Sequence, residues 1–119
     1  MIGDDPLELT THGDVVVAAL SGEIDLSNAR PLGPRIASAV PNEATGVVLD
    51  LTSTTYLDSS GLHVVFDLAA RLTSRQQRLA IALSEDSRVR RVLDLVDVES
   101  VAPVKASVDE AIEAVRTAP

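Results

Sequence analysis

Apolar and polar positions along the chain predict strands and helices in turn. Residues 7–21 hold two apolar runs around a His-Gly-Asp turn at 12–14, a pattern typical of a β-hairpin. A loop leads into a short helix, in which Pro34 suits the first turn and the apolar face consists of Ile36, Ala37 and Val40. Residues 46–51, GVVLDL, form a continuous apolar run that predicts a buried strand ending near Asp50.

The second half of the chain continues this alternation. A longer helix is expected after residues 56–62, and its apolar face is predicted to consist of Leu62, Val65, Phe66, Ala69 and Leu72. The opposite face of that helix is predicted to carry His63, Asp67 and Arg71. Residues 79–83 predict the next strand, and Ser84 is expected to cap a helix that runs to about Val96.

The last elements are a short strand and a final helix. Residues 101–104, VAPV, predict a strand at the edge of the sheet, because Pro103 cannot donate a ladder hydrogen bond. Ser107 is expected to cap the final helix, whose inward face consists of Val108, Ala111, Ile112 and Val115.

These elements follow the order β-β-α-β-α-β-α-β-α. Strands that alternate with helices pair in parallel, and the opening hairpin adds an antiparallel pair. We therefore expect an α/β fold with a mixed sheet. At 119 residues the chain fits one domain, 1–119, with a core at about 7–116.

Composition and charge remove several classes of function. The net charge is −8 and the basic cluster of Arg88, Arg90 and Arg91 is small, so we expect no nucleic-acid partner. The absence of cysteine excludes disulfides and thiolate metal sites, and two histidines, His12 and His63, argue against a histidine-based one. The acidic N-terminus lacks the apolar run of a signal peptide, and no apolar stretch approaches a membrane span of ~20 residues. We expect a soluble, cytoplasmic protein without a cofactor or a membrane partner.

Residues 56–62, YLDSSGL, are the candidate site. They join a predicted strand to a predicted helix, and ligands gather at such junctions in α/β folds. Asp58, Ser59 or Ser60 can cap the helix by accepting hydrogen bonds from its free N–H groups, while Gly61 permits close packing. Capping needs only one of these residues, and the junction offers three in a row.

Catalysis and nucleotide binding are the weaker interpretations of this junction. The G-x-S-x-G pattern of a serine hydrolase is absent, and nothing evident orients His63 as a general base. A nucleotide-binding loop needs further glycines and a lysine, which the stretch lacks. We expect no catalytic residues and no enzyme activity.

Two further interpretations remain open from the residues alone. A divalent cation such as Mg²⁺ favours oxygen ligands, which Asp25, Asp50 and Asp58 would supply if they converged. Alternatively, a phosphate on Ser59 or Ser60 would lie at a helix N-terminus, where free N–H groups and the macrodipole favour negative charge. Such a group would add about two negative charges beside an acid and would change the surface without unfolding the helix.

Three segments resemble the STAS domain family, in particular the bacterial anti-sigma factor antagonists. They are VVLDLTSTTYLDSSGLHVV, the earlier GEIDLSNA at 22–29, and the late RVLDLVDVESVAPV followed by SVDEAI. Together they span about a hundred residues in the expected order, which is far more specific than DSSG alone. The resemblance implies a mixed sheet with helices packed mainly on one face.

The resemblance also implies a function. Such proteins bind an anti-sigma factor that is also a serine kinase, and so release the sigma factor that it holds. The kinase binds ATP and phosphorylates the serine after the motif aspartate, here Ser59, with Ser60 as the secondary candidate; a metal-dependent serine phosphatase reverses this. The resemblance places Asp25 near Ser59. The implied partner-binding residues are Asp25, Asp58, Ser59, Ser60, Gly61 and His63.

One position departs from the family pattern. Many members have glycine in the segment matched here by LVDV, and this chain has Asp97, which tolerates a left-handed backbone better than most residues. Pro31 and Pro34 stiffen the start of the first helix. A structural or ligand-binding STAS module in a signalling scaffold is the alternative function. The oligomeric state stays open between a monomer and a weak dimer.

Overall fold

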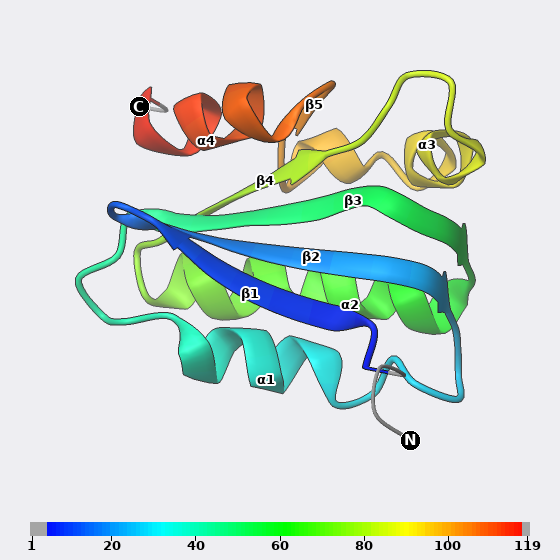
Figure 1. Cartoon of the computed structure of the whole chain (residues 1–119), viewed down its shortest axis with the longest axis horizontal. Helices are drawn as coiled ribbons and strands as arrows, with labels where there is room; N and C mark the ends of the chain where they lie inside the picture. Colours follow the sequence, from blue (N-terminus) through cyan, green and yellow to red (C-terminus); the bar gives the residue numbers. More distant parts are fainter. Residues whose placement is uncertain (1–4, 118–119) are drawn as a thin grey trace.

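The strands and helices follow the predicted order in the computed structural model, which describes residues 5–117 (Figure 1). The elements in chain order are β1 (Leu7–His12), β2 (Val15–Ile24), α1 (Leu32–Ala39), β3 (Gly46–Leu57), α2 (Ser59–Ser74), β4 (Arg78–Ala82), α3 (Arg88–Leu95), the 3-10 helix η1 (Val98–Ser100), β5 (Val104–Lys105) and α4 (Val108–Thr117).

The five strands form one mixed sheet in the order β1-β2-β3-β4-β5. The pair β1 and β2 is antiparallel, and the other three pairs are parallel. The predicted hairpin is confirmed, and its tight turn uses Gly13 with φ +63, a left-handed conformation that suits glycine.

Side chains of each strand alternate between two hydrophobic layers. On β3, Val47, Leu49 and Leu51 pack into the larger layer with α1, α2 and α3, whereas Val48 faces the smaller layer with α4. Three helices therefore contribute to the larger layer and α4 covers part of the other face, which confirms the expectation of helices mainly on one face. Figure 1 shows α1 and α2 on one side of the strands and α4 on the other. In the described part of the chain, no helix is both long and apolar enough to span a membrane.

Strand β3 is longer than predicted, and Asp50 does not end it. The strand continues through a polar segment to Leu57. Thr54 and Leu57 are buried in this segment, so they take the inward-facing positions that apolar residues occupy in the first half of the strand. The pairing with β4 ends at Asp50, while the pairing with β2 continues to Leu57, with two irregularities in register. The second half of β3 thus extends beyond β4.

The buried face of α2 agrees with the prediction only in part: Val65, Ala69 and Leu72 are buried as predicted. Val64 and Leu68 are buried although they were not predicted, and the predicted Leu62 and Phe66 are only partly buried. The inward stripe follows the i, i+3, i+4 series that starts at Gly61 and includes Val64, so the predicted stripe was rotated on the helix surface.

The predicted start of α3 was also wrong. Its cap is Ser87, whose hydroxyl accepts from the amide of Val89 at 3.0 Å, whereas the Ser84 hydroxyl accepts from Asp86 within the preceding turn. The helix ends at Leu95, one residue before the predicted Val96. The chain needs the 84–87 turn because β4 and α3 lie in different layers.

Three smaller predictions about the C-terminal part can be compared with the structure. Strand β5 lies at the sheet edge as expected but comprises only two residues, after Pro103. Ser107 accepts from the amide of Glu110 at 3.2 Å, which confirms it as the cap of α4. Asp97 has φ +53, so it adopts the left-handed conformation expected of the residue at this position.

Candidate functional site

Helix α2 begins with a carboxylate cap. Oδ1 of Asp58 accepts from the amides of Ser60 at 2.8 Å and Gly61 at 3.2 Å, so one side chain satisfies two of the helix's free N–H groups. Ser59 is the first helical residue, and its hydroxyl forms no hydrogen bond within residues 5–117. The interpretation that Ser59 caps the helix is therefore wrong, because Asp58 does so.

Gly61 fixes how closely α2 approaches the ends of β2 and β3. A Cβ atom at this position would lie 2.5 Å from Leu57 Cδ1 and 3.1 Å from the carbonyl oxygen of Ile24. The amide of Asp58 also donates to that carbonyl at 3.3 Å. Gly61 is buried, so it shapes the site and does not offer a side chain to a partner.

The loop after β2 carries the second acid of the site. Oδ1 of Asp25 accepts from the amide of Ser27 at 2.9 Å and from the Ser27 hydroxyl. These bonds, the hydroxyl first, lower the pKa of Asp25 and keep its carboxylate ionised. Asn28 closes the loop, since its amide group bonds the backbone of both Asp25 and Glu23.

Two hollows meet at this junction. The first is open, contains both acids, and is lined by Asp25, Leu26, Ser27, Tyr56 and Asp58. The second is a groove of about 560 Å³ between α1 and α2, and it contains Ser59, Ser60, His63 and Arg30 among its lining residues. Leu26 lines both hollows, so it separates the acids from the serines.

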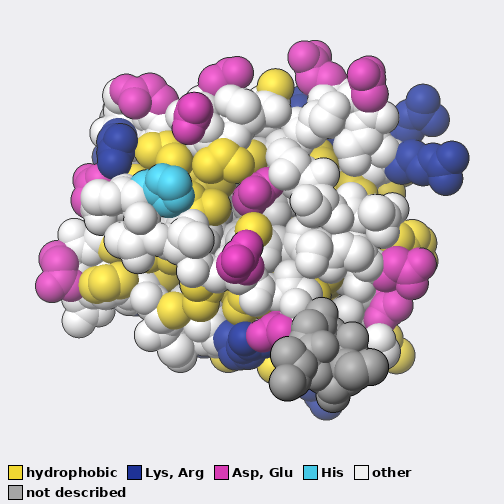
Figure 2. Space-filling model, in the orientation of Figure 1, with side chains coloured by type: hydrophobic (Ala, Val, Ile, Leu, Met, Phe, Trp, Pro, Cys, Tyr) yellow, Lys and Arg dark blue, Asp and Glu magenta, His cyan; other side chains and the backbone are white. Residues whose placement is uncertain are grey.

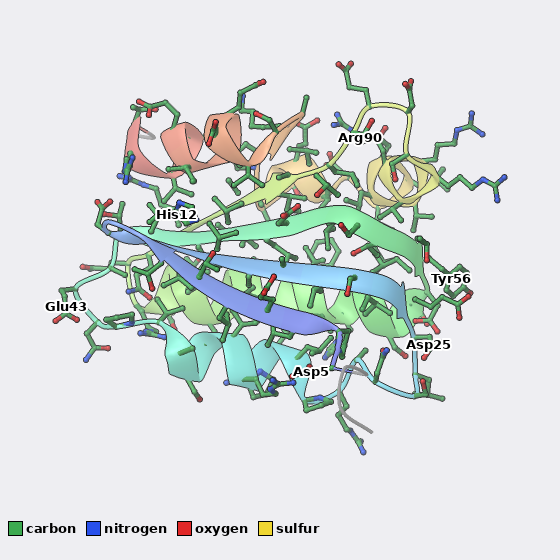
Figure 3. All side chains as sticks on the ribbon, viewed as in Figure 1. Asp5, His12, Asp25, Glu43, Tyr56 and Arg90 are labelled. Carbon is green, nitrogen blue, oxygen red and sulfur yellow. The ribbon has the colours of Figure 1, made fainter. Side chains whose placement is uncertain are left out.

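Two apolar side chains stand out from the surface here. Leu26 is 81% exposed and Tyr56 is 51% exposed. Figure 3 shows Tyr56 and Asp25 at the same end of the sheet, far from His12 and Glu43 at the other end. Exposed apolar residues ringed by polar groups are typical of protein-binding surfaces. Figure 2 shows acidic side chains spread over one face of the molecule and Lys and Arg mainly near its margins.

The groove has a fixed width. Arg75 follows α2 and donates to the carbonyl oxygens of Ala37 at 2.9 Å and Val40 at 2.7 Å, which ties the end of α1 to α2. Nearer the site, a Cβ atom at Gly33 would lie 2.8 Å from Oδ2 of Asp67, so the helices approach closely there as well. The groove walls are therefore held by direct contacts.

The structure brings together some of the predicted site residues. Asp25 and Asp58 share one hollow, and Ser59, Ser60 and His63 share the other. Asp50 is separate, since it lies within β3 and accepts from Thr52. Across residues 5–117, no three His, Cys, Asp or Glu side chains are grouped so that they could hold a metal ion.

Sequence reasoning missed Leu26 and Arg30 as site residues, and it assigned no role to Tyr56 within the candidate stretch. Leu26 lies in a polar loop and Tyr56 lies near the polar end of a strand. Their sequence positions alone do not indicate that both side chains are exposed and available to a partner. Arg30 lies in the loop before α1, and nothing in its spacing from Ser59 indicates that both line the same groove.

Comparison with known proteins places this fold and junction in a family. The STAS domain model matches residues 6–111, and the chain belongs to this family. BtrV of Bordetella bronchiseptica, named as an anti-sigma factor antagonist, is 33% identical over 104 residues, which cover 87% of this chain and 89% of BtrV. The anti-sigma-F factor antagonist RsfB of Mycobacterium tuberculosis is 26% identical over 118 residues, which cover 98% of this chain and 95% of RsfB.

A solved structure agrees with these relatives. The crystal structure of an anti-sigma factor antagonist from Mycobacterium paratuberculosis superposes with a TM-score of 0.80 and 26% identity, over 92% of each chain. The similarity therefore covers nearly all of the sheet and helices described above and is not confined to the junction.

Proposed function

We propose that this chain is an anti-sigma factor antagonist without catalytic activity of its own. It binds an anti-sigma factor of the serine-kinase type and so releases the sigma factor that this partner holds. The relatives support the first part of the proposal, because BtrV and RsfB carry the name of anti-sigma factor antagonists. The exposed pair Leu26 and Tyr56, next to the side chains of Asp25 and Asp58, supplies the kind of surface that a protein partner would cover.

Ser59 is the proposed switch. The observation that carries this proposal is that its hydroxyl is exposed at the start of α2 and serves neither as a cap nor in any hydrogen bond within residues 5–117. Phosphorylation can therefore change the surface without removing a bond that holds the helix. Ser59 Oγ attacks the γ-phosphorus of the partner's ATP; its bond to ADP breaks, and a base of the partner takes the hydroxyl proton. A serine phosphatase restores the bare hydroxyl by hydrolysis.

The phosphate would weaken binding by electrostatics and desolvation. It adds about two negative charges close to Asp58 and Asp25. Covering a doubly charged group whose charge is balanced only in part costs several kcal/mol, and about 1.4 kcal/mol corresponds to a tenfold change in Kd. We expect the affinity of the phosphorylated form to be at least a hundredfold lower.

The experiment is a binding and labelling assay with the anti-sigma factor from the same organism. Ser59→Ala should bind the partner without becoming labelled by ATP, and Ser59→Glu should bind poorly. Ser60→Ala is the matched comparison for labelling, since it removes the neighbouring hydroxyl and should still be labelled on Ser59. If Ser59→Ala is labelled as strongly as the wild type, the assignment of the phosphorylated serine is wrong.

A further inference from the structure

Opposite charges lie on the two sides of Ser59. Asp25 and Asp58 line the open hollow, and Ser59 does not. Ser59 lines the groove between α1 and α2, together with Arg30 and His63. Leu26 lines both hollows and Ser59 lines only the groove, so a group on the Ser59 oxygen has room on the groove side.

The helix itself offers little to such a group. The amides of Ser60 and Gly61 already donate to Asp58, so a phosphate on Ser59 would compete with a carboxylate for those two donors. The expectation that free N–H groups of the helix hold the phosphate therefore does not extend to these two amides. Other cationic or donor groups would have to balance its charge.

The groove supplies such groups. Arg30 is exposed in the loop before α1, and its guanidinium forms no ion pair with any carboxylate of residues 5–117. Arg71 also lines the groove, but Asp67 pairs with it at 2.8 Å and neutralises it. His63 lies four residues beyond Ser59, a spacing that brings two side chains together on a helix surface.

We propose that a phosphate on Ser59 is bound within the chain, in the α1–α2 groove, by the guanidinium of Arg30 and the imidazole of His63. The proposal rests on the proposed phosphorylation of Ser59. It assigns to the loop before α1 the role of receiving the phosphate, so the modified residue has a defined position over the groove. An arginine suits this role because its fork of N–H donors matches phosphate oxygens.

The test uses full-length protein in which phosphoserine is incorporated at position 59 during translation, so no kinase is needed. A ³¹P NMR titration gives the second pKa of the phosphate, whose ordinary value is about 6. A unit charge in contact with the phosphate, about 4 Å away in a water-like dielectric, lowers such a pKa by roughly 0.7 unit. Arg30→Gln should therefore raise the phosphate pKa by roughly that amount, and Arg30→Lys should restore most of the difference.

Arg91→Gln is the matched control, since Arg91 is an exposed arginine on α3 that lines neither hollow. A smaller rise from Arg91→Gln than from Arg30→Gln supports the proposal, and His63→Gln should perturb the ³¹P resonance as well. If Arg30→Gln and Arg91→Gln raise the phosphate pKa equally, or if neither raises it, the proposal is overturned. The readout needs no partner, so the loss of anti-sigma factor binding in the separate assay remains an independent result.

Discussion

Replacing Asp58 tests how much its side-chain cap contributes to the stability of α2. Asp58→Ala removes the acceptor of two backbone amides, at 2.8 and 3.2 Å, and loss of a helix cap costs about 1 kcal/mol in the free energy of unfolding. For a domain of this size the melting temperature should fall by about 4 °C. Asp58→Asn keeps an oxygen that can accept the same bonds and loses only the charge, so its cost should be a few tenths of a kcal/mol.

Urea denaturation followed by circular dichroism measures both variants against the wild type. Ser87→Ala is the matched control, because it removes a cap of α3 that accepts a single amide at 3.0 Å and lies outside both hollows. If Asp58→Ala and Asp58→Asn lose equal stability, the hydrogen bonds to the helix are not the reason for the loss. A wild-type melting curve for Asp58→Ala would refute the capping argument itself.

Further predictions concern two helical glycines and one surface ion pair. Gly61→Ala should lower the free energy of unfolding by about 1 kcal/mol, because overpacking outweighs the gain in helix propensity. Gly33→Ala should leave the free energy of unfolding unchanged, because only the flexible Asp67 carboxylate must move. Equal losses of stability in Gly61→Ala and Gly33→Ala, measured by urea denaturation, would contradict this. Arg35 lowers the pKa of Asp5 to about 2 from 3.8. The ion pair therefore contributes fully to the free energy of unfolding above a pH of about 4, and this contribution disappears toward pH 2. The difference in free energy of unfolding between the wild type and Arg35→Gln should close over that range. A difference that stays constant with pH in urea titrations would contradict the prediction.

The order of elements and the sheet arrangement could be predicted because they depend on local patterns. The Gly-Asp hairpin, the 46–51 run and the Ser107 cap each follow from neighbouring residues. The site was predictable only in part. The extension of β3 depends on its tertiary neighbours, since Thr54 donates from a buried position to the carbonyl of Leu20 at 2.8 Å. Arg30 and Ser59 line the same groove although one lies in a loop and the other begins a helix far along the chain, and such a placement leaves no periodic signal.

The different lengths of β3 and β4 determine how a large enzyme could reach Ser59. Seven residues of β3, Leu51 to Leu57, follow its last pair with β4, which at about 3.3 Å per residue carries the strand end roughly 23 Å farther. A kinase must enclose its acceptor hydroxyl in a deep catalytic cleft. The proposed phosphorylation of Ser59 would take place at this end of the β2–β3 pair, whereas β5 and α4 lie beyond β4 and on the other face (Figure 1). A second protein could therefore occupy α4 during phosphoryl transfer without a steric conflict.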